Sequence, residues 1–369
     1  MDSMCTWNLE DIVALTFIKK MSYKAKREIV SKYNSLYEYL NDDEQPSKFD
    51  SNVNDIIGIV NEAKKQLDLC EKNKIRIVTY WDEIYPSLLK KIVYPPNILF
   101  VKGELQNQDA VSISVVGTRR NSYYGKRSAE RFVKSFVNHG IIITSGMAIG
   151  IDSIAHRACI NENGITYAVI GCGIDKISGT ALSLANNIIE KNGAIISEYP
   201  CGTVARPQFF PQRNRIISGL SIATLVVESR SSGGALITAK FAYDEGREVF
   251  AVPGSIESET STGCNEWIAG NGSSGFFKAG CAYSPDYMLS ELNIINKDIP
   301  VVKTEEKIQF DTASEQKVYD NIFAEPISID DLQEVTKLDI SELLTTLMKL
   351  NFGGFIEELP GKLYIKKVN

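Results

Sequence analysis

The residues best suited to chemistry in this chain are glycines, hydroxyls and arginines that follow short apolar runs. The first such group comes directly after the apolar run 111–116. A glycine lets the backbone approach an anion, loop amides and a threonine hydroxyl can bind phosphate oxygens, and arginine supplies charge and forked donors. The alternative is a tight turn with one arginine in a structural ion pair. We predict phosphate contacts from this group, which consists of Gly117, Thr118, Arg119 and Arg120.

A second group lies at the start of a short predicted helix. Arg213, Asn214 and Arg215 combine positive charge with the exposed N–H groups of a helix N-terminus. The rings of Phe209 and Phe210, just before them, can stack on unpaired bases, which gives single strands affinity without sequence preference. The alternative is a buried Pro–Phe plug with an arginine ion pair. We predict that these five residues contact nucleic acid.

Paired glycines form a third group. Gly233 and Gly234 suit close approach of the backbone to a phosphate, and Thr238 and Lys240 follow in the next predicted helix. The group is not a P-loop, because the spacing Gly-x-x-x-x-Gly-Lys-Ser/Thr is absent. We predict that it binds phosphate through its backbone.

Ser145 and Gly146 begin another glycine-rich strand exit, which leads to Asp152, a predicted N-cap of the next helix. Asp152 and His156 stand one helical turn apart, so they could pair. A catalytic His–Asp relay needs a nucleophile, and no Gly-x-Ser-x-Gly elbow is present. We therefore predict a structural hydrogen-bonding role for His156 and no catalytic residue.

The sequence contains no complete motif for binding a dinucleotide cofactor or zinc. Gly171 and Gly173 resemble the start of a dinucleotide fingerprint, but Lys176 replaces its third glycine, which argues against NAD or FAD. The seven cysteines contain no Cys-x-x-Cys pair, so reduced thiols are expected rather than disulfides or zinc. We expect no cofactor and no metal.

These groups must be positioned by the elements that precede and follow them. Short Val- and Ile-rich runs alternate with segments of helical length, which predicts βαβ units around a buried parallel sheet. Right-handed crossovers then place every polar strand exit at one edge of the sheet, where ligands bind. The runs are 111–116, 141–143, 167–170, 194–196, 223–227 and 249–252, and the helices are 123–138, 152–163, 180–192, 212–219, 234–246 and 264–270.

The whole chain of 369 residues is long enough for several domains. We predict an α/β fold in four parts: a helical (SAM-like) domain over 1–72, an extended Rossmann-like domain with a parallel sheet over 73–290, a linker over 291–311 and a winged helix over 312–369. No apolar run is long enough to span a bilayer and the start does not resemble a signal peptide, so we expect a cytoplasmic protein without membrane contact.

Charge is distributed unevenly along the chain, whose net charge is −6. Segments 111–140 and 201–240 are basic, whereas the predicted winged helix is acidic, with a net charge of −4 over 314–369 (six Lys and Arg against ten Asp and Glu). An acidic module has poor affinity for phosphate. We therefore expect the winged helix to contact protein or to stabilise an oligomer.

In this order, the motifs resemble those of the DprA/Smf family of DNA-processing proteins. The matching segments are 114–120 with 124–125, 145–152 with 155–156, 210–219, 226–228, 235–239, 246–247 and 251–254, together with 85–92 and the closing winged helix. Two departures stand out: Ala235 replaces a common serine, and Asp175 lacks the Tyr-Pro that usually follows it.

The resemblance implies a dimeric, non-enzymatic protein that binds single-stranded DNA, protects it, and loads a RecA-type recombinase during natural transformation. Carried across to matching positions, it implies DNA-facing roles for Gly117, Arg119, Arg120, Ser145, Gly146, Arg213, Asn214, Arg215, Thr238 and Lys240. The alternative is a nucleotide-binding or nucleotide-hydrolysing enzyme of the lysine-decarboxylase-like group. In one register Lys240 replaces the acid of that group's motif, which favours holding a polyanion over hydrolysis.

Overall fold

The computed structural model describes residues 7–18, 21–42, 53–107, 110–272, 277–295, 310, 312–323 and 326–367. It divides into two compact units, Met1–Lys297 and Asp298–Asn369, each of which is described by itself. Of the predicted linker 291–311, all but residues 291–295 and residue 310 lie outside the described residues. The predicted domain boundaries therefore remain predictions.

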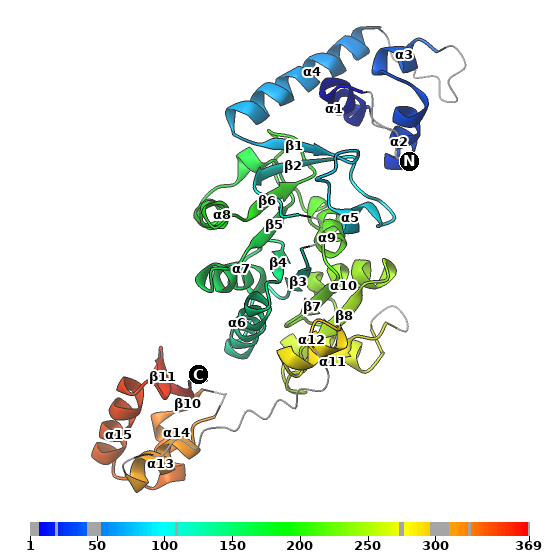
Figure 1. The fold of residues 1–369 in the computed structure, drawn as a ribbon. Coiled ribbons are helices and arrows are strands. Elements are labelled where there is room, and N and C mark those ends of the chain that lie inside the picture. The colour runs from blue at the N-terminus through cyan, green and yellow to red at the C-terminus, as the bar shows by residue number, and fades with distance from the viewer. Residues whose placement is uncertain are drawn as a thin grey trace. The chain divides into compact units, whose positions relative to one another are not determined.

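The larger unit is built on one sheet with the strand order β1-β2-β6-β5-β4-β3-β7-β8-β9 (Figure 1). From β6 to β9 in that order, neighbouring strands run parallel, which confirms the predicted parallel sheet. At one edge β2 is antiparallel to both β1 and β6. The strands are β1 Arg76–Thr79, β2 Ile98–Gly103, β3 Ser112–Val116, β4 Ile142–Ser145, β5 Thr166–Ile170, β6 Ala194–Ser197, β7 Ala223–Val226, β8 Glu248–Ala251 and β9 Gly280–Cys281.

Helices cover both faces of this sheet, which explains why its strands are apolar on both sides. Buried side chains of α5, α9, α10 and α11 form one core, and those of α6, α7 and α12 form the other. The bounds are α5 Ser87–Lys90, α6 Tyr123–Asn138, α7 Ile151–Asn161, α8 Thr180–Glu190, α9 Phe209–Gly219, α10 Gly234–Asp244, α11 Thr262–Ile268 and α12 Pro285–Glu291, with 3₁₀ turns at Ile174–Lys176 and Glu259–Ser261.

The start of α7 corrects one prediction. Asp152 does not cap this helix, because Gly150 occupies the N-cap position and Asp152 lies in the first turn. Gly150 has a φ of 93°, and the Ile151 N–H donates to the carbonyl oxygen of Thr118 (3.2 Å). A left-handed glycine lets the helix start close against the preceding loop, which leaves the Asp152 side chain for another role.

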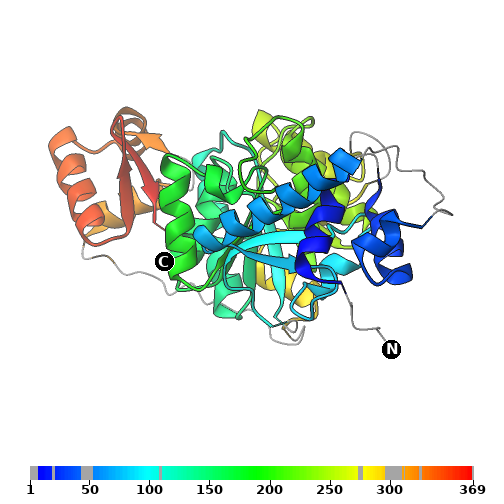
Figure 2. The same cartoon turned by 90° about the horizontal axis from the view of Figure 1, so that it is seen from above.

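In the described part of residues 1–75, the helices that precede the sheet are α1 Leu9–Phe17, α2 Tyr23–Lys32, α3 Leu36–Leu40 and α4 Val53–Lys72. In Figure 2 they lie over the β1–β2 edge, as they do in Figure 1. Their buried side chains share one apolar cluster with the sheet; Ile12 and Leu15 belong to the same cluster as Phe100 and Ile195. The helical segment therefore packs directly on the α/β core.

The smaller unit is a winged helix, as predicted. Its helices are α13 Ala313–Asp320, α14 Ile329–Thr336 and α15 Ile340–Phe352, and its three-stranded sheet consists of β10 Ile327–Ser328, β12 Leu363–Lys366 and β11 Ile356–Leu359 in that order. Val318, Leu332, Leu343 and Leu347 form its core. These residues recur at helical spacing, so each helix buries one face.

Candidate nucleic-acid interface

The candidate site lies where the direction of the sheet topology changes. From β3 the chain adds β4, β5 and β6 on one side, and later β7, β8 and β9 on the other. The loops that leave the carboxyl ends of β3 and β7 therefore run apart. A crevice at such a switch point is where open α/β sheets bind their ligands.

A pocket of about 700 Å³ occupies this crevice. Its walls come from the β3–α6 loop, the start of α7, the first half of α9 and the β7–α10 loop. Most of the residues predicted to contact DNA line it, namely Gly117, Thr118, Arg119, Arg120, Phe210, Arg213, Asn214, Gly233, Gly234 and Thr238. Segments that are far apart in the sequence are thus brought together as the topology predicts.

Three helices begin at this pocket without a side-chain cap. The N-caps of α7, α9 and α10 are Gly150, Gln208 and Gly233, and none of them makes a capping hydrogen bond. By contrast, the Ser122 hydroxyl caps α6 by accepting from the Gly125 N–H (3.0 Å). Some of the first N–H groups bond backbone oxygens instead, as Ile151 does to Thr118 and Phe209 to Arg206. The positive ends of the three helix dipoles nevertheless favour an anion in the pocket.

Glycine allows the first wall of the pocket to form. A Cβ atom on Gly117 would lie 2.6 Å from the Ile151 side chain, which is too close for any larger residue without movement. The β3–α6 loop therefore packs directly against the start of α7. This contact sets the position of Thr118 and of the two arginines that follow it.

Glu228 anchors the same loop through hydrogen bonds, a role that the sequence analysis missed. The carboxylate is buried and accepts hydrogen bonds from the Ser122 N–H (2.9 Å), the Ser122 hydroxyl (2.5 Å) and the Thr260 hydroxyl (3.1 Å). Its backbone oxygen also accepts from the Thr118 N–H (2.8 Å). The signal was available: Glu228 follows an apolar run directly, as Gly117 does.

The positive charge on the pocket floor is buried. The Arg213 guanidinium donates to the carbonyl oxygens of Gly146 (2.6 Å) and Val169, and burial lowers its pKa to about 10. Burial likewise raises the pKa of the neighbouring Asp152 carboxyl to about 6, although Arg213 and nearby backbone N–H groups pull it down. Asp152, whose role in the pocket was also missed, thus offsets the charge of Arg213.

An aromatic ring lies between the buried and the exposed arginines. The guanidinium carbon of Arg119 lies 5.6 Å from the centre of the Phe210 ring, and that of Arg213 lies 6.0 Å from it. Arg119 and Arg120 are exposed at the mouth of the pocket. The pocket therefore offers an aromatic ring together with cations that are free to reach solvent, a combination that suits a nucleotide.

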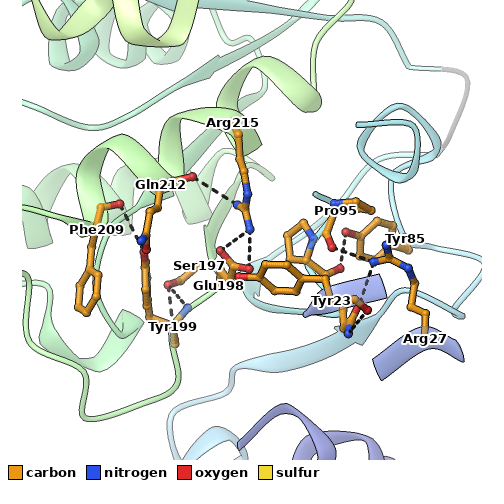
Figure 3. Close-up of polar contacts among 12 residues, drawn as sticks. Tyr23, Arg27, Tyr85, Pro95, Ser197, Glu198, Tyr199, Phe209, Gln212 and Arg215 are labelled. Atoms are coloured by element: carbon orange, nitrogen blue, oxygen red, sulfur yellow. Dashed lines mark hydrogen bonds and ion pairs between the residues drawn. The ribbon is translucent and has the colours of Figure 1, made fainter. Parts of the chain in front are cut away.

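Arg215 does not line the pocket. Its guanidinium donates to both carboxylate oxygens of Glu198 (2.7 and 2.8 Å) and lies 5.4 Å from the Tyr23 ring of α2 (Figure 3). This is the structural ion pair that was the alternative for the α9 arginines. Phe209 does not line the pocket either, and its ring centre lies 4.4 Å from that of Tyr199.

Three further predicted residues also lie outside the pocket lining. Ser145 is buried and donates to the Val115 carbonyl oxygen (2.6 Å), while the carbonyl of Gly146 is used by Arg213. The Lys240 ammonium lies 5.6 Å from the Phe277 ring centre. These residues support the pocket walls or lie on an outer surface.

His156 has the structural role that was predicted. The ring is buried, its Nδ1 bonds the Thr166 hydroxyl (2.7 Å), and burial lowers its pKa to about 3. Because the Thr166 hydroxyl donates to the Ile143 carbonyl oxygen, it must accept from His156, which fixes the proton on Nδ1. His156 is a neutral core residue.

Within the ranges that the structure describes, no three His, Cys, Asp or Glu side chains gather as a metal ion would require. No helix in those same ranges is long and apolar enough to cross a lipid bilayer.

Comparison with known proteins assigns the chain to a family. A family model for DNA recombination-mediator protein A matches residues 76–278, more than half of the chain, and one for the DprA winged helix domain matches residues 303–362. The chain belongs to the DprA/Smf family. The resemblance found in the sequence is thereby confirmed, and the matched regions are those that hold the pocket and the winged helix.

Individual members of the DprA/Smf family agree with this assignment. Protein Smf of Escherichia coli is 36% identical over 284 residues, which are 76% of this chain and 74% of the relative. The solved structure of DNA processing protein A from Streptococcus pneumoniae superposes with a TM-score of 0.61 at 29% identity, covering 77% of this chain and 98% of the other.

A second solved structure shares the fold at lower similarity. DNA processing protein A of Helicobacter pylori, studied for its single-stranded DNA binding mode, has a TM-score of 0.51 at 23% identity and covers 59% of this chain and 96% of its own.

Proposed function

We propose that this protein binds single-stranded DNA by its backbone in the pocket above β3 and β7, protects it without cleaving it, and delivers it to a RecA-type recombinase during natural transformation. The proposal rests on membership of the DprA/Smf family and above all on one observation. Uncapped helix N-termini, a glycine loop and exposed arginines converge on one pocket.

The chemistry of the pocket favours a nucleic-acid strand over a small neutral ligand. Phosphate is bound by guanidinium side chains and at the positive ends of helix dipoles, and the exposed Arg119 and Arg120 line this pocket beside the start of α7. The Phe210 ring offers a stacking surface that tolerates any base. We assign the contacts to the ten pocket-lining residues named above, we assign supporting roles to Ser145, Gly146 and Phe209, and we assign Arg215 to its ion pair with Glu198.

The test replaces the two exposed arginines together. Arg119→Ala with Arg120→Ala should weaken binding to single strands of every sequence and reduce the slope of log affinity against log salt by up to about 1.4, since each of two phosphate contacts contributes about 0.7. Binding is measured by fluorescence anisotropy at several salt concentrations. No residue that braces the loop is changed.

The matched control is Arg131→Ala with Lys134→Ala, which removes the same charge from exposed positions farther along α6. It should change the affinity less than twofold. If the pocket variant, with an unchanged circular dichroism spectrum, binds as tightly as this control, the site assignment is wrong.

The enzyme alternative retains one supporting observation. Of the residues that line the pocket, all within the described part of the chain, Asp152 alone is acidic, and its raised pKa would suit a general acid. Glycosidic hydrolysis usually requires two carboxylates, so we favour binding without catalysis. Turnover of nucleoside monophosphates that disappears in Asp152→Asn would reverse this choice.

We further propose that the protein is a cytoplasmic homodimer and that the winged helix contacts protein. The exposed apolar residues Ile340, Leu344, Met348 and Phe352 support this role. They recur every four residues, so they form one stripe along α15. A DNA-reading helix carries polar and basic side chains at such positions.

A further inference from the structure

Two buried thiols meet where the N-terminal helices contact the α/β core. The Sγ atoms of Cys70 and Cys201 lie 4.0 Å apart, although the residues are 131 positions apart in the sequence. Cys70 is in the last turn of α4, and Cys201 is in the loop that follows β6. Their exposed fractions are 3% and 5%, and the adjacent Glu71 and Gly202 are exposed, so the pair lies close to the protein surface along the chain.

The loop that carries Cys201 connects this contact to the candidate site. Gln66 of α4 donates to the Cys201 carbonyl oxygen (3.1 Å), so α4 already holds the loop. On the other side, the Tyr199 hydroxyl donates to the Phe209 carbonyl oxygen (3.4 Å) at the start of α9 (Figure 3). A bond between the two thiols would thus join the N-terminal helices covalently to the segment that leads into the pocket wall.

We propose that Cys70 and Cys201 form an oxidisable dithiol, which a hydroperoxide converts into a disulfide that fixes α4 to the loop leading into α9. The proposal goes beyond DNA binding and does not depend on it. The two sulfur atoms are within contact distance at 4.0 Å, and disulfide formation requires them to approach to about 2 Å. The two thiols are already adjacent in the folded protein.

The two thiols have different roles in this reaction. One S–H···S hydrogen bond joins the two thiols, and either sulfur can donate it. This interaction lowers the pKa of Cys201 and raises that of Cys70. Cys201 is therefore the sulfur that is more readily ionised and attacks first. Cys70 is the resolving thiol.

The electrons and atoms balance with hydrogen peroxide as the oxidant. The Cys201 thiolate attacks one peroxide oxygen, the O–O bond breaks, and hydroxide leaves and takes a proton to become water, which yields a sulfenic acid. Cys70 then attacks the Cys201 sulfur, the S–O bond breaks, and the hydroxyl leaves as water with the Cys70 proton. Two thiols and one peroxide give one disulfide and two waters.

Other cysteines of the same unit provide built-in controls. Cys159 and Cys264 are buried, each with a carbonyl oxygen as its hydrogen-bond acceptor (Ile165 at 3.3 Å and Val226 at 3.8 Å). Burial raises the pKa of both thiols to about 12. They should resist oxidation under conditions that oxidise the pair.

The test treats the reduced, full-length protein with hydrogen peroxide and removes the excess. After denaturation, a maleimide mass tag should report two fewer free thiols than in the untreated protein, and intact mass should fall by two hydrogens. Digestion without reductant should yield one peptide that joins residues 70 and 201. Dithiothreitol should reverse the change, and the oxidised form should melt on the order of 5 °C higher, because the bond closes a long loop.

Cys201→Ala should abolish the loss of thiols at Cys70, whereas Cys159→Ala should leave the linked peptide unchanged. The wild-type peptide map decides the question even if Cys201→Ala does not fold. Sulfinic acid at Cys201 with Cys70 still free, a disulfide between two copies of the chain, or equal oxidation of Cys159 would each overturn the proposal.

Discussion

On the pocket floor, Arg213 and Asp152 bring opposite charges out of water side by side. Each ion offsets only part of the desolvation cost of the other, and for Asp152 desolvation is the larger effect. A phosphate that entered the pocket would compete with Asp152 for the guanidinium. The charge state of the Asp152 carboxyl therefore controls how strongly the pocket attracts anions.

We predict that affinity for single-stranded DNA rises by a few-fold to about tenfold as the pH falls from 7.5 to 5.5. The pKa of Asp152 is about 6, so this step protonates the carboxyl and removes a negative charge that repels phosphate. Asp152→Asn should bind more tightly at pH 7.5 and should lose most of the pH dependence. Anisotropy titrations at constant ionic strength measure both effects, and equal slopes in the two proteins would contradict this account.

The same pKa predicts the sign of a stability effect. The folded-state pKa of about 6 lies above the unfolded value near 4, so the folded state holds more protons between these limits. The contribution of Asp152 to stability is thus fully present at low pH and is lost as the pH rises through 6. In urea titrations, Asp152→Asn should reduce this trend relative to the wild type.

For Arg215 we predict a loss of stability without a loss of DNA affinity. Arg215→Met leaves the Glu198 carboxylate buried without its partner, so the free energy of unfolding should fall by about 3–5 kcal/mol. Replacing both residues, with Arg215→Met and Glu198→Leu, should restore most of the loss. Urea denaturation provides the values, and the folded single variant should bind DNA like the wild type, because Arg215 does not line the pocket.

At the scale of elements, the pocket depends on how closely its loops pack. Gly117→Ala would place a methyl group within 2.6–2.9 Å of the Ile151 side chain, so the β3–α6 loop must move away from α7. We predict a loss of about 1–3 kcal/mol in the free energy of unfolding, together with weaker DNA binding.

Gly234→Ala is the matched control, because a Cβ atom there would meet nothing within 4 Å. This substitution lies in the first turn of α10 and should leave stability unchanged or slightly higher, since alanine is the better helix former. Thermal melts of the two variants separate a packing effect from a general intolerance of alanine. Equal destabilisation of both would remove the packing argument.

At the scale of the whole molecule, the two units carry different candidate surfaces. Every residue that lines the pocket belongs to Met1–Lys297, whereas the exposed apolar stripe belongs to the winged helix. DNA binding and self-association should therefore be separable by substitution.

We predict that Leu344→Ser with Met348→Ser lowers self-association and leaves affinity for single-stranded DNA within about twofold of the wild type, because both side chains are solvent-exposed on α15. Sedimentation velocity measures the first quantity and anisotropy the second. The control is Ser341→Ala with Thr345→Ala on the same helix, which should change neither. An unchanged sedimentation profile in the serine variant would show that the dimer, if formed, uses another surface.

Local sequence was sufficient for the elements but not for the direction of single side chains. On α9, Arg213 and Arg215 are two residues apart and thus point about 200° away from each other. One reaches the pocket floor while the other reaches Glu198. Thr238 and Lys240 on α10 are related in the same way, and only Thr238 lines the pocket. Helical geometry alone could have shown that only one residue of each pair lines the pocket.

The sequence by itself determined the alternation of strands and helices, the winged helix and the edge of the sheet at which function is sought. These features follow from apolar periodicity and turn residues, which act over a few positions. Only the tertiary structure decided which cations face the pocket, that Asp152 and Glu228 serve it, and that Cys70 lies against Cys201. Such pairings depend on packing between segments that are distant in the chain, and no local pattern records them.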